Sequence, residues 1–229
     1  MKNEREHVQS ITVITDSSCY SRADRATDPG YAELHALSNY SFLRGASSPG
    51  ELVEQAVALG YQALAITDEC SFAGIVRAHV RLEELRADTG CTLKLIVGTE
   101  LALGDGCRLV LLAADTRGYE SICALITKAR RAAPKGEYRV SDALLEAACL
   151  DQVPMLLVPP GSPARREAIE HRFGWVRALS SRAAIALELH LGTYDEHHLA
   201  WLERMGARHG LPLAAAGDVH MHVRARRAL

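Results

Sequence analysis

The chain has 229 residues, of which 48% are hydrophobic and 24% are charged. These proportions are ordinary for a soluble globular protein, and the length suffices for one α/β barrel or two smaller domains. The formal net charge of −2 excludes a global basic field that would attract nucleic acid. No apolar run reaches the length of about 18 residues that a membrane span needs, so we expect no membrane partner.

The six cysteines are widely spaced and form no C-x-x-C pair. This spacing argues against a zinc ribbon or a disulfide framework, and it favours a reduced, cytoplasmic setting. Residues 1–30 are polar and mixed in charge, and they lack the apolar segment of a signal peptide. We therefore predict a loosely ordered leader over 1–30, with at most a short strand at 11–14.

From residue 31 onward, strand-like and helix-like segments alternate. The predicted strands cover residues 31–37, 63–67, 94–99, 108–113, 153–158, 184–191 and 213–216. The predicted helices cover residues 51–59, 72–88, 119–131, 141–149, 162–173 and 195–209. Ser47 or Ser48 before Pro49 is a typical helix start, and Gly60 is a typical helix end. The alternation predicts a parallel sheet, either open or closed into a barrel.

Acidic residues and histidines occur at four of the predicted strand ends. Glu33 and His35 lie two residues apart, as do Asp218 and His220, and His222 follows them. Residues i and i+2 of a strand point to the same face, so each pair can offer two metal ligands at once. Further acids follow two buried strands, namely Asp68, Glu69 and Glu100. Because the carboxyl ends of parallel strands often form active sites, these residues predict a mixed carboxylate and imidazole cluster suited to zinc, manganese or iron.

The same residues occur in motifs that resemble a known superfamily. Glu33 to Gly45 resembles motif I of the PHP (polymerase and histidinol phosphatase) superfamily, and Ala65 to Glu69 resembles motif II. Gly98-Thr99-Glu100 is similar to the G-x-E element, and Asp218-Val219-His220 to the closing D-x-H. Within the superfamily, the match is with the N-terminal PHP domain of error-prone bacterial C-family DNA polymerases, which are like the polymerase III alpha subunit. The residues that support this narrower match are 37–47, 66–71 and 131–139.

The resemblance implies an α/β fold, a distorted (β/α)7 PHP barrel with parallel strands and outer helices, over residues 31–229. It also implies a metal cleft at the carboxyl ends of the strands. The chain stops directly after the last motif, so we expect the domain to be truncated at its C-terminal end. The implied partners are the remaining domains of the polymerase, DNA through the parent enzyme, and partners of the mutasome type.

The sequence departs from the PHP pattern at several ligand positions. Glu33 and Glu69 stand where histidines are usual, and Arg44 replaces an acid. Arg108 opens a strand where metal-binding relatives often carry histidine. By resemblance, the remaining candidate metal ligands are Glu33, His35, Asp68, Glu69, Glu100, Asp218 and His220. Arg44 would place a fixed positive charge near them, as part of an ion network or second shell.

These departures leave more than one function open. We favour a structural scaffold with a degenerate metal site, which binds zinc, manganese or magnesium in fewer copies than a full three-ion cluster. The alternative is a metal-dependent phosphoesterase or 3′–5′ exonuclease, and no catalytic residue can be assigned with certainty. A free-standing phosphatase fits less well because ligands are lost. The polymerase acids themselves lie outside this chain, since nothing in it resembles a palm-domain carboxylate pair.

Three further features have simple structural interpretations. We expect His190 to be a core or rim residue of its strand instead of a ligand. His197 and His198 lie at an acidic helix start, and we expect both to be solvated. Gly104-Asp105-Gly106 predicts a plain hairpin turn, because no helix follows it to make a phosphate loop.

Overall fold

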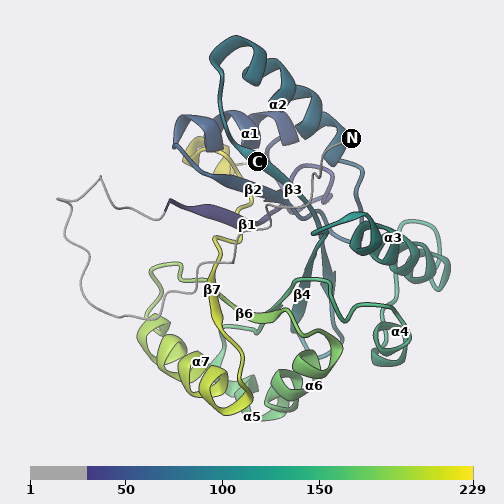
Figure 1. The fold of residues 1–229 in the computed structure, drawn as a ribbon. Helices are drawn as coiled ribbons and strands as arrows, with labels where there is room; N and C mark the ends of the chain where they lie inside the picture. Colours follow the sequence, from purple (N-terminus) through teal and green to yellow (C-terminus); the bar gives the residue numbers. More distant parts are fainter. Residues whose placement is uncertain (1–29, 229) are drawn as a thin grey trace, which may run out of the picture.

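The computed structural model describes residues 30–228, which form one seven-stranded sheet with surrounding helices (Figure 1). The leader predicted over residues 1–30 lies outside the described residues, apart from Gly30. The strands follow one another in sequence order across the sheet. They are β1 (Ala32–Ala36), β2 (Ala63–Ile66), β3 (Lys94–Ala102), β4 (Arg108–Leu112), β5 (Met155–Val158), β6 (Ala183–Leu187) and β7 (Leu213–Ala215).

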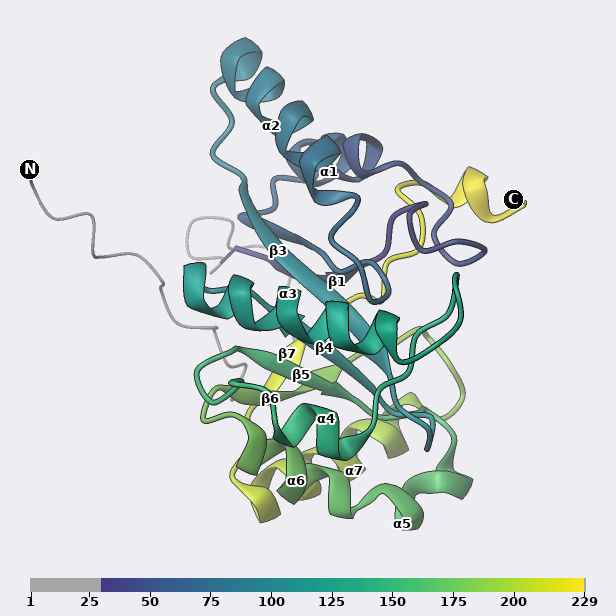
Figure 2. The ribbon, with the colours of Figure 1, turned by 90° about the vertical axis from the view of Figure 1, so that its right-hand side faces the viewer.

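The helices lie outside the sheet, with α1 and α2 together at one end and α4 to α7 at the other (Figure 2). The α-helices are α1 (Pro49–Ala58), α2 (Ile75–Thr89), α3 (Thr116–Arg131), α4 (Asp142–Glu146), α5 (Arg166–Ile169), α6 (His171–Leu179) and α7 (Asp195–His209). Two 3-10 helices, η1 (Pro163–Arg165) and η2 (Arg224–Ala228), complete the described part. The single helix predicted over 162–173 is therefore wrong, because three short helices occupy residues 163–179. None of the described helices combines the length and apolar character needed to cross a membrane.

The sheet nearly closes into a barrel, because the chain after β7 returns to β1. The Val219 N–H donates to the carbonyl of His35 at 2.9 Å, and the Leu37 N–H donates to the carbonyl of Val219 at 2.8 Å. Ala36 and Val219 form a parallel bridge. This arrangement confirms the predicted seven-stranded α/β barrel with outer helices, and it brings the first and last sequence motifs together.

One strand runs against the predicted direction. β4 pairs antiparallel with both β3 and β5, whereas the other four pairings are parallel. The connection from β3 to β4 is the hairpin predicted at residues 104–106, in which the Leu103 N–H donates to the carbonyl of Cys107 at 2.8 Å. Such a short link cannot make the crossover that a parallel pair requires. The expectation of parallel strands throughout is thus wrong at β4.

Small and branched side chains fill the interior of the barrel. Alanines contribute half of the buried interior cluster, which contains Leu34, Ala65, Val110, Leu112, Leu156, Val158, Ala184, Ala186, Ala214 and Ala216. Two other clusters pack the helices against the outside of the sheet. The interior is therefore a filled core, and the polar residues at the strand ends lie above an apolar floor.

Local sequence also sets the ends of elements near the site. Ser48 accepts a hydrogen bond from the Glu51 N–H, and the Glu51 side chain accepts one from the Ser48 N–H, so α1 begins with a capping box, as its Ser-Pro start indicates. The pairing of β1 with β2 shifts by one residue between Glu33 and Ala36. A β-bulge of this kind redirects side chains, and here it lies at the first predicted ligand pair.

Candidate functional site

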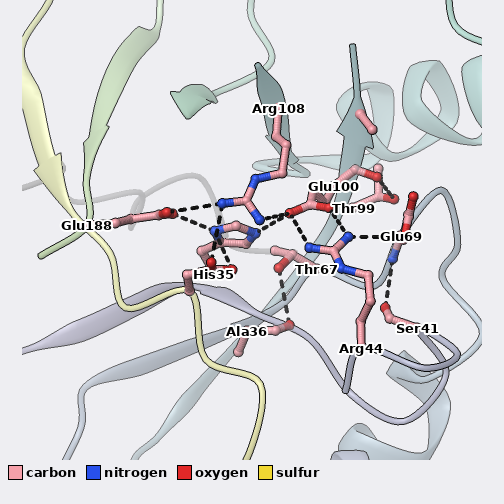
Figure 3. A network of polar contacts seen from close by, with 12 residues as sticks. His35, Ala36, Ser41, Arg44, Thr67, Glu69, Thr99, Glu100, Arg108 and Glu188 are labelled. Carbon is pink, nitrogen blue, oxygen red and sulfur yellow. Dashed lines mark hydrogen bonds and ion pairs between the residues drawn. The ribbon is translucent and has the colours of Figure 1, made fainter. Parts of the chain in front are cut away.

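Seven charged side chains meet at one end of the barrel, where the parallel strands end and the antiparallel β4 begins. They make contact through hydrogen bonds and ion pairs (Figure 3). They come from β1, the loop after it, the end of β2, β3, β4, the end of β6 and the segment after β7. We call this set the ion network, and its members are His35, Arg44, Glu69, Glu100, Arg108, Glu188 and Asp218. Arg44 and Arg108 approach Glu100 from opposite sides in Figure 3.

His35 is at the centre of the ion network and is fully buried. Its Nε2 lies 2.9 Å from Glu100 Oε2, and its Nδ1 lies 2.6 Å from Glu188 Oε1. Burial lowers the pKa of the imidazole, but the hydrogen bonds and charges of the two carboxylates outweigh it and raise the pKa to about 9. His35 is consequently an imidazolium at neutral pH, and both of its nitrogens donate protons.

Glu100 is the most highly connected acid of the ion network. Its carboxylate accepts hydrogen bonds from Arg44 Nη1 and, at 3.3 Å, from Arg44 Nη2, and Arg108 Nη1 lies 3.4 Å from Oε2. Burial raises the pKa of Glu100, but the hydrogen bonds from His35 and Arg44 reverse this and lower it to about 2. Its charge is therefore stabilised by three protein cations.

Asp218 and Glu188 occupy the other side of the ion network. Arg108 Nη2 lies 3.2 Å from Asp218 Oδ2 and 3.4 Å from Glu188 Oε2. The His220 Nε2 is 3.0 Å from Asp218 Oδ1. Burial opposes the charge of Asp218, yet the hydrogen bond from His220 and the charges of His35 and Arg108 hold its pKa well below the usual range.

Glu69 joins the ion network to α3 and to the segment after it. Its Oε2 accepts a hydrogen bond from Arg44 Nη1 at 3.0 Å, and its Oε1 accepts one from the Tyr138 hydroxyl at 2.7 Å. Arg130 of α3 donates to the Glu69 carbonyl at 3.1 Å. These contacts fix Glu69 at the rim of the site.

Asp68 lies beside the ion network but has different partners. Its carboxylate accepts hydrogen bonds from the Ser38 N–H at 2.8 Å, the Ser38 hydroxyl at 2.7 Å and the Ser41 hydroxyl at 2.7 Å. We call Ser38, Ser41 and Asp68 the hydroxyl cradle. Gly74 closes it, because a Cβ on Gly74 would come within 2.5 Å of the Asp68 carboxylate.

Glu33 is also held by uncharged donors. Its Oε1 accepts hydrogen bonds from the backbone N–H groups of His35 and Gly217 at 2.8 and 2.9 Å, and its Oε2 accepts one from the Tyr31 hydroxyl at 2.9 Å. Burial raises the pKa of Glu33 in spite of these bonds. Glu33 thereby connects β1 to the segment that follows β7.

The predicted ligands thus divide by their surroundings. Among the described residues, nitrogen and oxygen ligand atoms lie within 4.8 Å of one another in two groups of three. The first group contains His35, Glu100 and Asp218, three of the seven predicted ligands. The second contains Glu188, His190 and Asp218, of which only Asp218 was predicted. Glu33, Asp68, Glu69 and His220 belong to neither group.

Sequence reasoning missed Glu188 as a member of the site. Glu188-Leu189-His190 repeats the spacing of Glu33-Leu34-His35 at the end of another strand, and this spacing could have revealed it. The predicted strand 184–191 ends at Leu187, so His190 lies beyond the strand and is exposed at the rim. The expectation that His198 is solvated is wrong, because it is only 7% exposed and packs against Trp201.

Strained backbone conformations surround the site. Within residues 30–228, four non-glycine residues have a left-handed φ, and they are Leu43 (62°), Cys70 (47°), Leu191 (58°) and Asp218 (46°). Leu43 directly precedes Arg44, and Cys70 directly follows Glu69. Such conformations cost about 1–3 kcal/mol each and persist only where the surroundings impose them. The loops that deliver the ion network are therefore held in place by the rest of the fold.

Comparisons with known proteins show the family of this chain. The PHP domain family model matches residues 33–162, more than half of the chain. An error-prone DNA polymerase from Methylococcus capsulatus is 50% identical over 200 residues, and one from Pseudomonas fluorescens is 52% identical over 200 residues. Each match covers 87% of this chain but 18% of the relative, so the chain spans about a fifth of the length of these curated relatives.

Two solved structures share the fold at low sequence identity. One is from Bifidobacterium adolescentis and is described as a metal-dependent phosphoesterase, with a TM-score of 0.55, 17% identity, and coverage of 84% of this chain and 88% of that chain. The other is an amidohydrolase from Chromobacterium violaceum with bound sulfate and no metal, with a TM-score of 0.55, 18% identity, and coverage of 83% and 87%. These two structures show that the fold is shared, and the family model that matches more than half of the chain shows that this chain belongs to the PHP domain family.

Proposed function

We propose that this chain is the PHP domain of an error-prone DNA polymerase, in which it acts mainly as a structural scaffold with a degenerate metal site. The error-prone polymerases that it resembles at 50–52% identity support the first part. Its partners would be the other domains of that polymerase and, through them, DNA and mutasome-type proteins. Translesion synthesis would be an activity of the parent enzyme, whose catalytic acids lie elsewhere.

The observation that most supports a scaffold role is that the guanidinium groups of Arg44 and Arg108 both contact the Glu100 carboxylate. Arg44 and Arg108 lie where metal ions would have to approach this buried carboxylate. Arginine stays protonated at all relevant pH values, so it neutralises the acid permanently. Three divalent ions would require both arginines to leave and His35 to lose one proton so that one ring nitrogen could bind a metal, so the residues present do not fit a full three-ion cluster.

One observation favours the alternative, a metal-dependent phosphoesterase or exonuclease. His35, Glu100 and Asp218 converge closely enough for one divalent ion such as zinc, manganese or magnesium. A structure with the same fold is described as a metal-dependent phosphoesterase. The group is too small for more than one ion, and we assign no catalytic step to it.

Nuclease assays distinguish the two functions. The protein is stripped with a chelator, reloaded with manganese and incubated with single-stranded DNA labelled at its 5′ end. We expect no cleavage above that of a variant with both His35→Ala and His220→Ala, and a metal content below about two ions per chain. A rate that the double variant abolishes, while the surface control His79→Ala retains it, would contradict the scaffold role.

A further inference from the structure

A cavity of about 490 Å³ opens beside the ion network, at the end of the barrel where β5 and β6 finish and the antiparallel β4 begins. Its walls include Arg108, Pro159, Glu188, His190, His198 and Asp218. Neither the family motifs nor the proposed function uses the β6 side of this cavity. The cavity is therefore a candidate binding site for a ligand other than those of the ion network.

The second ligand group lies in this cavity wall. Ligand atoms of Glu188, His190 and Asp218 lie within 4.8 Å of one another. His190 is exposed and forms no hydrogen bond or ion pair with any described residue, so its ring nitrogens are available. One imidazole and two carboxylates are ligands that divalent transition metals accept, with water completing the coordination.

The outer group is more accessible to an ion than the inner group of His35, Glu100 and Asp218. An ion at the inner group must break both hydrogen bonds of His35 and displace Arg44 and Arg108 from Glu100. At the outer group, an ion that binds Glu188 Oε2 and Asp218 Oδ2 competes with Arg108, whose contacts there are 3.4 and 3.2 Å long. The other oxygen of each carboxylate stays with His35 at 2.6 Å and with His220 at 3.0 Å.

Charge also favours a cation at this position. The four carboxylates of the ion network outnumber its two arginines, Arg44 and Arg108. Glu188 and Asp218 are the two of these carboxylates that face the cavity. Asp195 adds a further acid to the cavity wall.

A second feature of the cavity points to a polar occupant. His198 lines it and is only 7% exposed, yet its Nδ1 has no hydrogen-bond partner among the described residues. A buried polar atom without a partner costs about 1–3 kcal/mol, so such atoms normally meet water or a ligand group. The cavity thus combines three convergent ligand atoms with a lining residue, His198, whose buried Nδ1 has no hydrogen-bond partner among the described residues.

We propose that Glu188, His190 and Asp218 bind one divalent transition-metal ion at the mouth of the barrel, on the side of the ion network that faces the cavity. Zinc is the first candidate, since imidazole and carboxylate are among its usual ligands. The ion would add positive charge at the mouth while Arg44 and Glu100 keep their contacts inside. This site goes beyond the scaffold function and does not depend on it.

A cobalt titration tests the site directly. The full chain, stripped of metal, is titrated with Co²⁺ while the visible absorption bands of the bound ion are recorded, and Zn²⁺ is then added as a competitor. We expect one site per chain that zinc displaces. His190→Ala should weaken binding at least about tenfold, because it removes the only imidazole ligand. Arg108→Gln should tighten binding, because it removes the competing cation.

Matched variants decide between the outer and inner groups. His79→Ala, on the surface of α2, should leave the titration unchanged, and His35→Gln should change affinity by less than His190→Ala does. Circular dichroism and thermal unfolding of each variant establish that it is folded. The proposal is wrong if no cobalt binds, if His190→Ala binds as the parent does, if His35→Gln has the larger effect, or if thiolate absorption bands show binding by cysteine.

Discussion

Asp68 and Glu100 are almost completely buried acids at neighbouring strand ends, yet different kinds of groups surround them. Asp68 lies in the hydroxyl cradle, where its donors are uncharged. Glu100 lies in the ion network, where His35, Arg44 and Arg108 supply positive charge. The two regions are connected through the loop that contains Ser41 and Arg44.

The comparison shows two ways of stabilising a buried carboxylate. Uncharged hydrogen-bond donors held at short, fixed distances stabilise a buried carboxylate without a positively charged partner. The same hydrogen bonds define the shape of the loop. A carboxylate surrounded by cations depends on each of them, because the loss of one partner leaves uncompensated charge in a poorly solvated place. We therefore expect the ion network to be more sensitive to charge substitutions and to pH than the hydroxyl cradle.

The largest effect should follow from removing Arg44. Arg44→Ala leaves Glu100 and Glu69 without their shared partner, and we expect it to lower the free energy of unfolding by roughly 3 kcal/mol. Urea denaturation in the presence of a chelator measures this change. The matched control is Arg226→Ala, which removes an ion pair with Glu51 at the surface and should cost less than about 1 kcal/mol. Equal losses in the two variants would contradict the comparison.

A smaller effect is expected in the hydroxyl cradle. Asp68→Asn replaces an acceptor oxygen by an NH₂ group that faces donors, so we expect a loss of about 2 kcal/mol. Because the donors are uncharged, this loss should be the same at low and high salt in urea denaturation. Ser41→Ala, which removes one of the three donors, should have about half the effect. A strong salt dependence of the Asp68→Asn loss would show that charge matters here as well.

The ion network should also make stability depend on alkaline pH. His35 has a pKa of about 9 in the folded protein and about 6.5 when unfolded, so its contribution is complete below pH 6.5 and is lost as pH rises through 9. Glu100, Glu188, Asp218 and Arg108 are the charged groups around it. We expect a decrease of up to about 3 kcal/mol over this range in chelator-treated protein. His35→Gln should flatten the curve, and an unchanged slope would assign the titration to another group.

The smallest effect concerns backbone strain at the junction of the two regions. Leu43 is 90% exposed and has a φ of 62°, a conformation that glycine adopts without cost. Leu43→Gly should stabilise the protein by about 0.5 kcal/mol, because relief of strain exceeds the added entropy of the unfolded chain. Thermal unfolding measures the shift, and Leu43→Ala is the control that should stay near the parent. Destabilisation by glycine would mean that the loop is not strained.

Much of the barrel could be predicted from the sequence, because its strands are apolar runs followed by turns or helix starts. The antiparallel direction of β4 was implicit in the Gly104-Asp105-Gly106 turn but was outweighed by the regular alternation of elements. The division of 163–179 into three helices has no comparable sequence marker. The direction of a strand depends on the length of one connection, which periodicity alone does not show.

Several members of the ion network were predictable from the sequence, whereas Glu188 was missed and the predicted ligands Glu33, Asp68 and His220 lie outside the network. The position of Arg44 in the ion network agrees with its replacement of an acid in motif I. Glu188 was overlooked because its strand was expected to continue to Leu191 and because no motif of the family marks it. The buried state of His198 depends on packing against Trp201, which lies three residues further along α7. The pairing of each nitrogen with its carboxylate depends on how strand ends that are distant in sequence come together, so the sequence alone does not show it.

The central claim is that protein cations neutralise the buried acids of this PHP domain. A double-mutant cycle of Arg44→Ala and Glu100→Gln, measured by urea denaturation in chelator, tests it most directly. We predict a coupling free energy of at least about 2 kcal/mol, with Glu100→Gln offsetting part of the loss caused by Arg44→Ala. Additive effects of the two substitutions would contradict the claim, since they would show that the arginine does not stabilise the charge of Glu100.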